Sequence, residues 1–106
     1  MKKILQINFK FKIPRSELEK AFLKDAPTFR PGGQVKGLLW KIWLMNEAEK
    51  TAGGIYLFED GASVETFLNG LFAEAKKSMG EAVSDVTVKV FDILLEPTKI
   101  TRGPVG

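Results

Sequence analysis

The segment from Gly37 to Glu47, GLLWKIWLMNE, is apolar on both sides of an extended chain, and no other feature constrains the fold as strongly. Successive side chains of a strand point to opposite faces of the sheet. One face would carry Leu38, Trp40, Ile42 and Leu44, and the other would carry Leu39, Lys41, Trp43 and Met45. A sheet built on this strand therefore needs cover on both of its faces.

The rest of the chain supplies three more strands and two helices. Strand patterns cover residues 3–13, 53–59 and 86–95. The strand over residues 53–59 forms a hairpin with the strand over residues 37–47. Ser16 and Glu19 are typical of a capping box that starts the first helix. Asp60 is placed to cap the second helix, which Gly80 ends. The order β-α-β-β-α-β predicts a ferredoxin-like α+β fold, with two helices on one face of a four-stranded antiparallel sheet.

We expect one domain over residues 1–97 and a C-terminal tail over residues 98–106, because the tail has no pattern of its own. The two helices can cover only one face of the sheet. The other face would expose apolar residues from several strands, and large exposed apolar patches usually mark an interface. The sequence therefore predicts a homodimer that packs sheet against sheet.

Composition limits the chemistry of this chain. Its 106 residues include no cysteine and no histidine, so disulfides, the usual zinc sites and histidine-based nucleophilic catalysis are excluded. The carboxylates are too scattered to predict a metal site. The formal charge of +3 is mild, and no apolar stretch has the length of a membrane helix. We expect a cytoplasmic protein that does not bind nucleic acid or membranes.

RNA-recognition modules share this order of elements, so RNA binding is an alternative function for this fold. Their third strand carries a basic residue and several aromatics that stack on bases. Aligning the last of those aromatics with Phe58 puts Thr51, Gly53 and Ile55 at the other positions. None of the three is basic or aromatic, so the sequence argues against RNA binding.

A W-K-x-W strand (Trp40 to Trp43) is followed, after a polar turn, by GGIYLF (Gly53 to Phe58). With the opening LQINFKF and the closing VKVFDILLEP, these strings resemble the YdhR-like monooxygenases of the dimeric α/β-barrel superfamily. The resemblance covers essentially the whole chain. It implies a homodimeric barrel with the helices outside, and oxidation of a small aromatic or quinol-type substrate by dioxygen without a cofactor. Haem-degrading members of the superfamily hold iron with a histidine, which this chain lacks.

Such a site needs an apolar pocket and a polar group that deprotonates the substrate or holds its anion. We expect Lys41 and Tyr56 as catalytic residues, with no metal, flavin or haem. Candidate substrate-binding residues are Trp40, Trp43, Asn8 and Lys89.

Structural roles remain open for the same side chains. The tryptophans are candidates for the core or the dimer interface, and the Tyr56 hydroxyl for a bond within that interface. Lys41 and Lys89 are candidates for ion pairs with Glu47, Glu59 or Asp92. The alternative function is a non-catalytic dimeric module that binds a small hydrophobic molecule.

Overall fold

The computed structural model describes residues 1–106 and confirms the ferredoxin-like order. The main elements are β1 (Lys3–Phe11), α1 (Arg15–Asp25), β2 (Leu38–Asn46), β3 (Thr51–Phe58), α2 (Gly61–Asn69), α3 (Leu71–Met79) and β4 (Val83–Asp92). Short helical segments η1 (Ala26–Phe29), η2 (Gly80–Ala82) and α4 (Leu95–Ile100) complete the chain. The strands form one antiparallel sheet in the order β2-β3-β1-β4.

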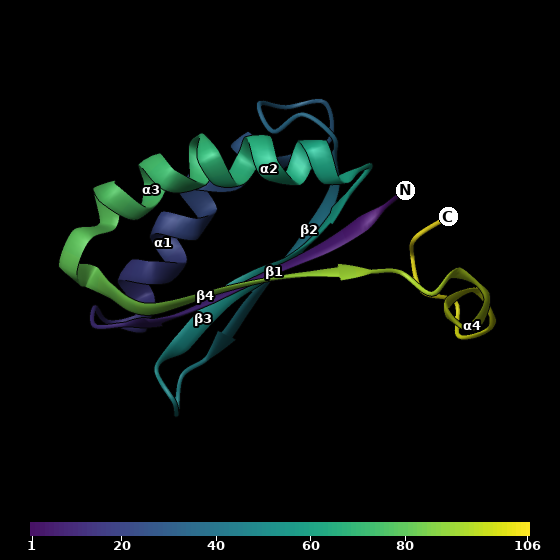
Figure 1. The fold of residues 1–106 in the computed structure, drawn as a ribbon. Coiled ribbons are helices and arrows are strands. Elements are labelled where there is room, and N and C mark those ends of the chain that lie inside the picture. The colour runs from purple at the N-terminus through teal and green to yellow at the C-terminus, as the bar shows by residue number, and fades with distance from the viewer.

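Helices α1, α2 and α3 all lie on one side of the sheet (Figure 1). Between them and the strands lies the main core, formed by Leu5, Ile7, Val35, Leu38, Tyr56, Phe58, Val64 and Phe67. A smaller cluster of Phe11, Leu18 and Ala52 packs beside it. The expected alternation along β1 is therefore confirmed for Leu5, Ile7 and Phe11, because these apolar residues face the helices and are buried.

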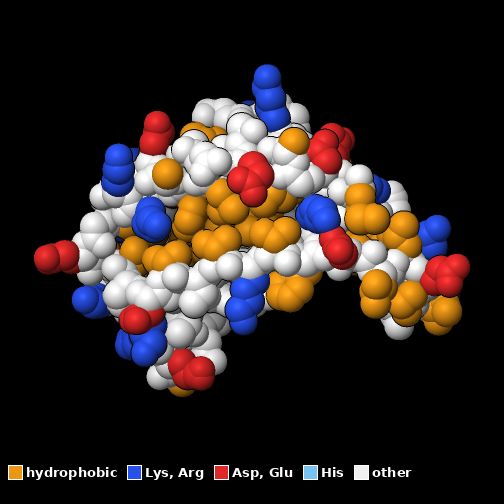
Figure 2. All heavy atoms as spheres, in the orientation of Figure 1, with side chains coloured by type: hydrophobic (Ala, Val, Ile, Leu, Met, Phe, Trp, Pro, Cys, Tyr) orange, Lys and Arg blue, Asp and Glu red, His pale blue; other side chains and the backbone are white.

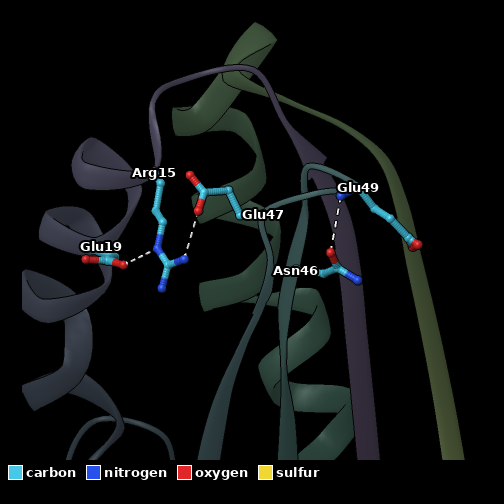
Figure 3. Close-up of polar contacts among 5 residues, drawn as sticks. All are labelled: Arg15, Glu19, Asn46, Glu47 and Glu49. Atoms are coloured by element: carbon cyan, nitrogen blue, oxygen red, sulfur yellow. Dashed lines mark hydrogen bonds and ion pairs between the residues drawn. The ribbon is translucent and has the colours of Figure 1, made fainter.

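The start of α1 differs from the expected capping box. The helix begins at Arg15, Pro14 occupies the N-cap position, and no side chain bonds to the free amides. Instead the Glu19 carboxylate accepts a bond from Arg15 Nε at 2.5 Å (Figure 3). Arg15 Nη1 also donates to Glu47 in the β2–β3 turn at 2.9 Å, so the helix is tied to the hairpin. The guanidinium holds Glu19 away from the amides that a capping box would satisfy.

The second helix is interrupted, although its expected ends are confirmed. Asp60 accepts a bond from the Ser63 amide at 2.8 Å and caps α2, while α3 ends at Gly80. At Gly70 the backbone leaves helical angles, with φ −110° and ψ −100°, and divides the helix into α2 and α3.

The C-terminal segment contains a helix that the sequence pattern did not indicate. Strand β4 ends at Asp92, and α4 then runs across the expected boundary between residues 97 and 98. Pro97 lies in the first turn of α4, where a proline is tolerated because its missing amide needs no partner. Figure 1 shows α4 projecting beyond the end of β4, with the C-terminus returning towards the N-terminus.

The last residues return to the sheet face that carries no helices. Trp40 Nε1 donates to the Pro104 carbonyl oxygen at 2.8 Å, and Lys2 Nζ donates to the Val105 carbonyl oxygen at the same distance. Val105 is buried by this return. Elsewhere on that face Ile42 and Phe91 stay 48% and 45% exposed, so the tail covers only part of it.

One expected assignment in β2 is wrong. The pairing register of β2 and β3 shifts between Leu38 and Trp40, and Leu38 joins the core on the helix side. Trp40 and Ile42 stay on the opposite face, because the irregularity separates Leu38 from their alternation. No helix of the chain is long and apolar enough to cross a membrane.

Candidate functional site

A cavity of about 100 Å³ lies between the helix layer and the sheet. Its walls come from β1, β2, β3, β4, α1, η1, α2 and α3, and most of the lining side chains are apolar. Seven aromatic residues contribute: Phe9, Phe22, Phe29, Trp43, Tyr56, Phe67 and Phe72. In Figure 2, hydrophobic side chains gather in a band between the helices and strand β4. The cavity is therefore an apolar space inside one chain.

The amine of Lys41 lies in an aromatic cage on the helix side of β2. Its Nζ is 3.4 Å from the centre of the Trp43 ring, 3.8 Å from that of Phe29 and 4.6 Å from that of Tyr56. Lys41 makes no hydrogen bond or ion pair through this amine. An amine held only by ring faces is free to interact with a molecule that enters the cavity.

Burial in this apolar surrounding lowers the pKa of Lys41 to about 7, because the charged ammonium form loses its hydration. The negative charge of Asp25 at the end of α1 opposes that effect and raises the pKa in part. A neutral amine is thus available near neutral pH, and it can take a proton or attack a carbonyl carbon.

Tyr56 lies opposite Lys41 in the pairing of β2 with β3. Its side chain is buried, and burial raises the pKa of the phenol because the phenolate form would lose its solvation. The hydroxyl makes no hydrogen bond to another residue of the chain. Tyr56 therefore stays protonated across the neutral range and offers a free donor to a molecule in the cavity.

Two adjacent glycines make room for this arrangement. A Cβ on Gly54 would lie 2.9 Å from Cε of Lys41 and 3.3 Å from Cε1 of Tyr56. A Cβ on Gly53 would lie 1.9 Å from the Ile7 carbonyl oxygen, so that position admits no side chain. The backbone of β1 therefore approaches Gly53 closely, and the missing Gly54 side chain leaves the space that Lys41 occupies.

The structure divides the candidate site residues into two groups. Lys41, Trp43 and Tyr56 line the cavity together. Trp40, Asn8 and Lys89 belong to the opposite face of the sheet and do not line it. Trp40 bonds to the C-terminal tail there, and Lys89 is exposed.

The ion pairs considered for the two lysines do not form. Asp92 pairs with Lys3, and Glu47 pairs with Arg15. Glu59 makes no ion pair. The only carboxylate that lines the cavity with Lys41 is that of Asp25, and it affects the amine through its charge without a direct bond.

Sequence reasoning missed several residues of the cavity wall. Phe22 and Asp25 come from α1, and Phe29 comes from η1, which contains Pro27. Lys76 of α3 is exposed and also lies along the cavity wall. The spacing of Phe22 and Asp25 is a usable signal, because residues three apart share one side of a helix. No group of three potential metal-ligating side chains comes together.

Comparison with known families gives this geometry a context. The family model described as "Putative mono-oxygenase ydhR" matches residues 4–104. The chain belongs to this family. The match includes every strand that carries the cavity, and the ydhR family is part of the dimeric α/β-barrel superfamily, in which the structural neighbours also lie. Among curated proteins, no sequence is similar enough to count as a relative.

Solved structures share the fold at low sequence identity. A protein of unknown function from Nitrosomonas europaea, NE2512, is 20% identical with a TM-score of 0.72, covering 88% of this chain and 89% of that one. SnoaB, a cofactor-independent oxygenase from Streptomyces nogalater, is 16% identical with a TM-score of 0.66, covering 90% and 98%. The heme-degrader MhuD from Mycobacterium tuberculosis is 20% identical with a TM-score of 0.62, covering 88% and 97%. These similarities establish the ferredoxin-like fold of the ydhR member.

Proposed function

We propose that this protein is a cofactor-independent monooxygenase that oxidises a small aromatic or quinol-type molecule with dioxygen. The observation that carries the proposal is the unpaired amine of Lys41 in an aromatic cavity beside the free hydroxyl of Tyr56. Membership of a mono-oxygenase family and the fold shared with the oxygenase SnoaB support it.

In the proposed reaction the substrate supplies the electrons. The neutral amine of Lys41 removes an acidic proton from a phenol or from a CH₂ group flanked by aromatic rings. The resulting anion is oxidised by dioxygen: one oxygen atom enters the product, as when CH₂ becomes C=O, and the other leaves as water. The two hydrogens of the water and all the electrons come from the CH₂ group, so no further reductant is needed.

Each cavity residue has a part in this scheme. The Lys41 ammonium that forms is stabilised by the faces of Trp43 and Phe29 and by the substrate anion. Tyr56 donates a hydrogen bond to the oxygen on which negative charge develops. The apolar wall excludes water, which strengthens both interactions.

The size of the cavity limits how the substrate binds. About 100 Å³ is less than the ~150 Å³ of an engineered cavity that holds benzene. We infer that the reacting edge of the ring enters the cavity while the rest stays in its mouth. The exposed side chains of Asp25 and Lys76 belong to the cavity wall and would contact polar substituents there.

We further propose that the protein is a homodimer formed through the sheet face that carries no helices. Ile42 and Phe91 are exposed on that face, and Leu94, Leu95 and Ile100 are exposed on the adjoining C-terminal segment. Burial of this apolar surface against a second copy would remove it from water. The cavity lies between the sheet and the helices, so its lining residues are outside this interface.

Oxygen uptake tests the enzymatic proposal. Protein and an anthrone or a quinol are mixed without oxygen, air is admitted, and uptake is compared with that of the substrate alone. We expect faster uptake with the protein, and at least a tenfold loss in Lys41→Met but not in Lys89→Met, whose lysine lies on the other face. Binding without faster uptake across a panel of such substrates would favour the non-catalytic binding module.

A further inference from the structure

The amine of Lys41 has the surroundings of a nucleophile as well as those of a base. It lies in an apolar cavity, its Nζ has no hydrogen-bond or ion-pair partner, and the ring faces of Trp43 and Phe29 hold it in place. Lysines that attack carbonyl groups are activated in this way, by desolvation in a hydrophobic pocket. The other lysine of the cavity wall, Lys76, is exposed on α3.

We propose that Lys41 captures small apolar aldehydes or ketones as an imine within this cavity. The nitrogen attacks the carbonyl carbon, so a C–N bond forms and the C=O π bond breaks. The carbonyl oxygen then leaves as water with both protons of the neutral amine, and a C=N bond remains. The step consumes no oxidant or reductant.

Tyr56 supplies the acid that this condensation needs. It pairs directly with Lys41 across the two strands. Its hydroxyl can donate a proton to the departing oxygen and take one back from the nitrogen, so Tyr56 ends protonated and the two protons of the water still come from the amine. The raised pKa of Tyr56 keeps that proton in place at neutral pH, and the lowered pKa of Lys41 keeps part of the amine neutral. Nucleophile and acid therefore belong to adjacent strands of one cavity wall.

The cavity volume selects the class of carbonyl compound. About 100 Å³ is less than the ~150 Å³ of an engineered cavity that holds benzene. An aldehyde of a few carbon atoms fits inside completely, whereas a ring has to remain partly in the mouth. We therefore expect propanal to react faster at Lys41 than benzaldehyde does.

Reductive trapping tests this inference. The full chain is incubated at pH 7 with propanal and sodium cyanoborohydride, which converts an imine into a stable propyl amine, and the modified sites are mapped by peptide mass spectrometry. We expect modification of Lys41 at least tenfold faster than that of Lys20, an exposed lysine on α1 outside both the cavity and the proposed dimer face. Modification of the N-terminal amine of Met1 is mapped as a separate site. Labelling spread evenly over the lysines, or no labelling of Lys41, would overturn the proposal.

Variants and atmosphere separate this activity from the proposed oxygenation. Lys41→Arg should lose the fast site and Lys20→Arg should keep it. The mapping of the unaltered protein decides the matter even if Lys41→Arg does not fold. Trapping needs no dioxygen, so it is carried out under argon. If Lys41 forms the imine but the protein does not speed oxygen uptake, only the oxygenase proposal is refuted. If the protein speeds oxygen uptake but Lys41 forms no imine, only the imine proposal is refuted.

Discussion

Lys41 and Tyr56 are direct partners across strands β2 and β3, with the lysine amine 4.6 Å from the centre of the tyrosine ring. Burial acts on the two groups in opposite senses, lowering the pKa of Lys41 and raising that of Tyr56. The neutral forms of both groups are favoured, so a base and an acid coexist in one cavity. This pair is the centre of the account.

The first prediction concerns the pH dependence of the oxygen-uptake rate. Asp25, Tyr56 and Lys76 are the ionisable groups that line the cavity with Lys41. We expect the rate to rise through about pH 7, as Lys41 loses its proton, after subtraction of the uncatalysed oxidation. Asp25→Asn should move the midpoint to lower pH, because its charge stabilises the ammonium form. Glu19→Gln, a change on the same helix, is the control and should leave the midpoint unchanged.

The second prediction concerns the free energy of unfolding as a function of pH. The pKa of Lys41 is lower in the folded chain than in the unfolded chain, so the unfolded state binds more protons between pH 7 and pH 10. Stability should therefore rise with pH over this window, relative to Lys41→Met, by on the order of 3 kcal/mol. Parallel urea denaturation of both proteins across this range measures the difference. Equal slopes for the two proteins would contradict a buried, depressed lysine.

The third prediction concerns Gly54. In Gly54→Ala the new methyl group would displace the flexible end of Lys41 and crowd the Tyr56 ring, so we expect at least a tenfold loss of oxygen uptake with a folded protein. Gly61→Ala is the control, because its Cβ would meet only Cε of Lys3, at 3.8 Å. Circular dichroism and uptake measurements are made on both variants. Full activity in Gly54→Ala would show that the position of the Lys41 amine is unimportant.

Several parts of the fold could be predicted from the sequence because they depend on local pattern. The two-residue period of β1, the hairpin of β2 and β3, and the Asp60 cap all follow from neighbouring residues. The failures involve competition over longer range. Glu19 bonds to Arg15 instead of a helix amide, and Arg15 in turn reaches Glu47 in the distant hairpin turn.

The candidate site was predictable only in part. Because successive side chains of a strand point to opposite faces, Trp40 and Trp43 lie on opposite sides of the sheet, and one cavity cannot be lined by both. The structure resolves the choice of side, because Trp43 faces the helices and Trp40 bonds to the tail carbonyl of Pro104. The contribution of Phe29 depends on the path of η1 over the sheet. No pattern within that short segment indicates such a path.

The fourth prediction concerns the proposed dimer. Phe91 is 45% exposed on the sheet face without helices, and Phe91→Asp would place a charge in the proposed interface. We expect the parent protein to sediment as a dimer at micromolar concentration and Phe91→Asp as a monomer. Leu23→Asp, on the exposed part of α1, should remain dimeric. A monomeric parent protein would refute the interface.

We propose that Lys41 is an accessible base in an aromatic cavity and is largely neutral just above pH 7. NMR of protein labelled with ¹³C at lysine Cε tests it directly, by titration of the Lys41 resonance with and without phenol. We expect a midpoint near pH 7 in the free protein, and a higher midpoint with phenol bound, because the phenolate stabilises the ammonium form. A midpoint near the ordinary lysine value of about 10.4, unchanged by phenol, would contradict the account.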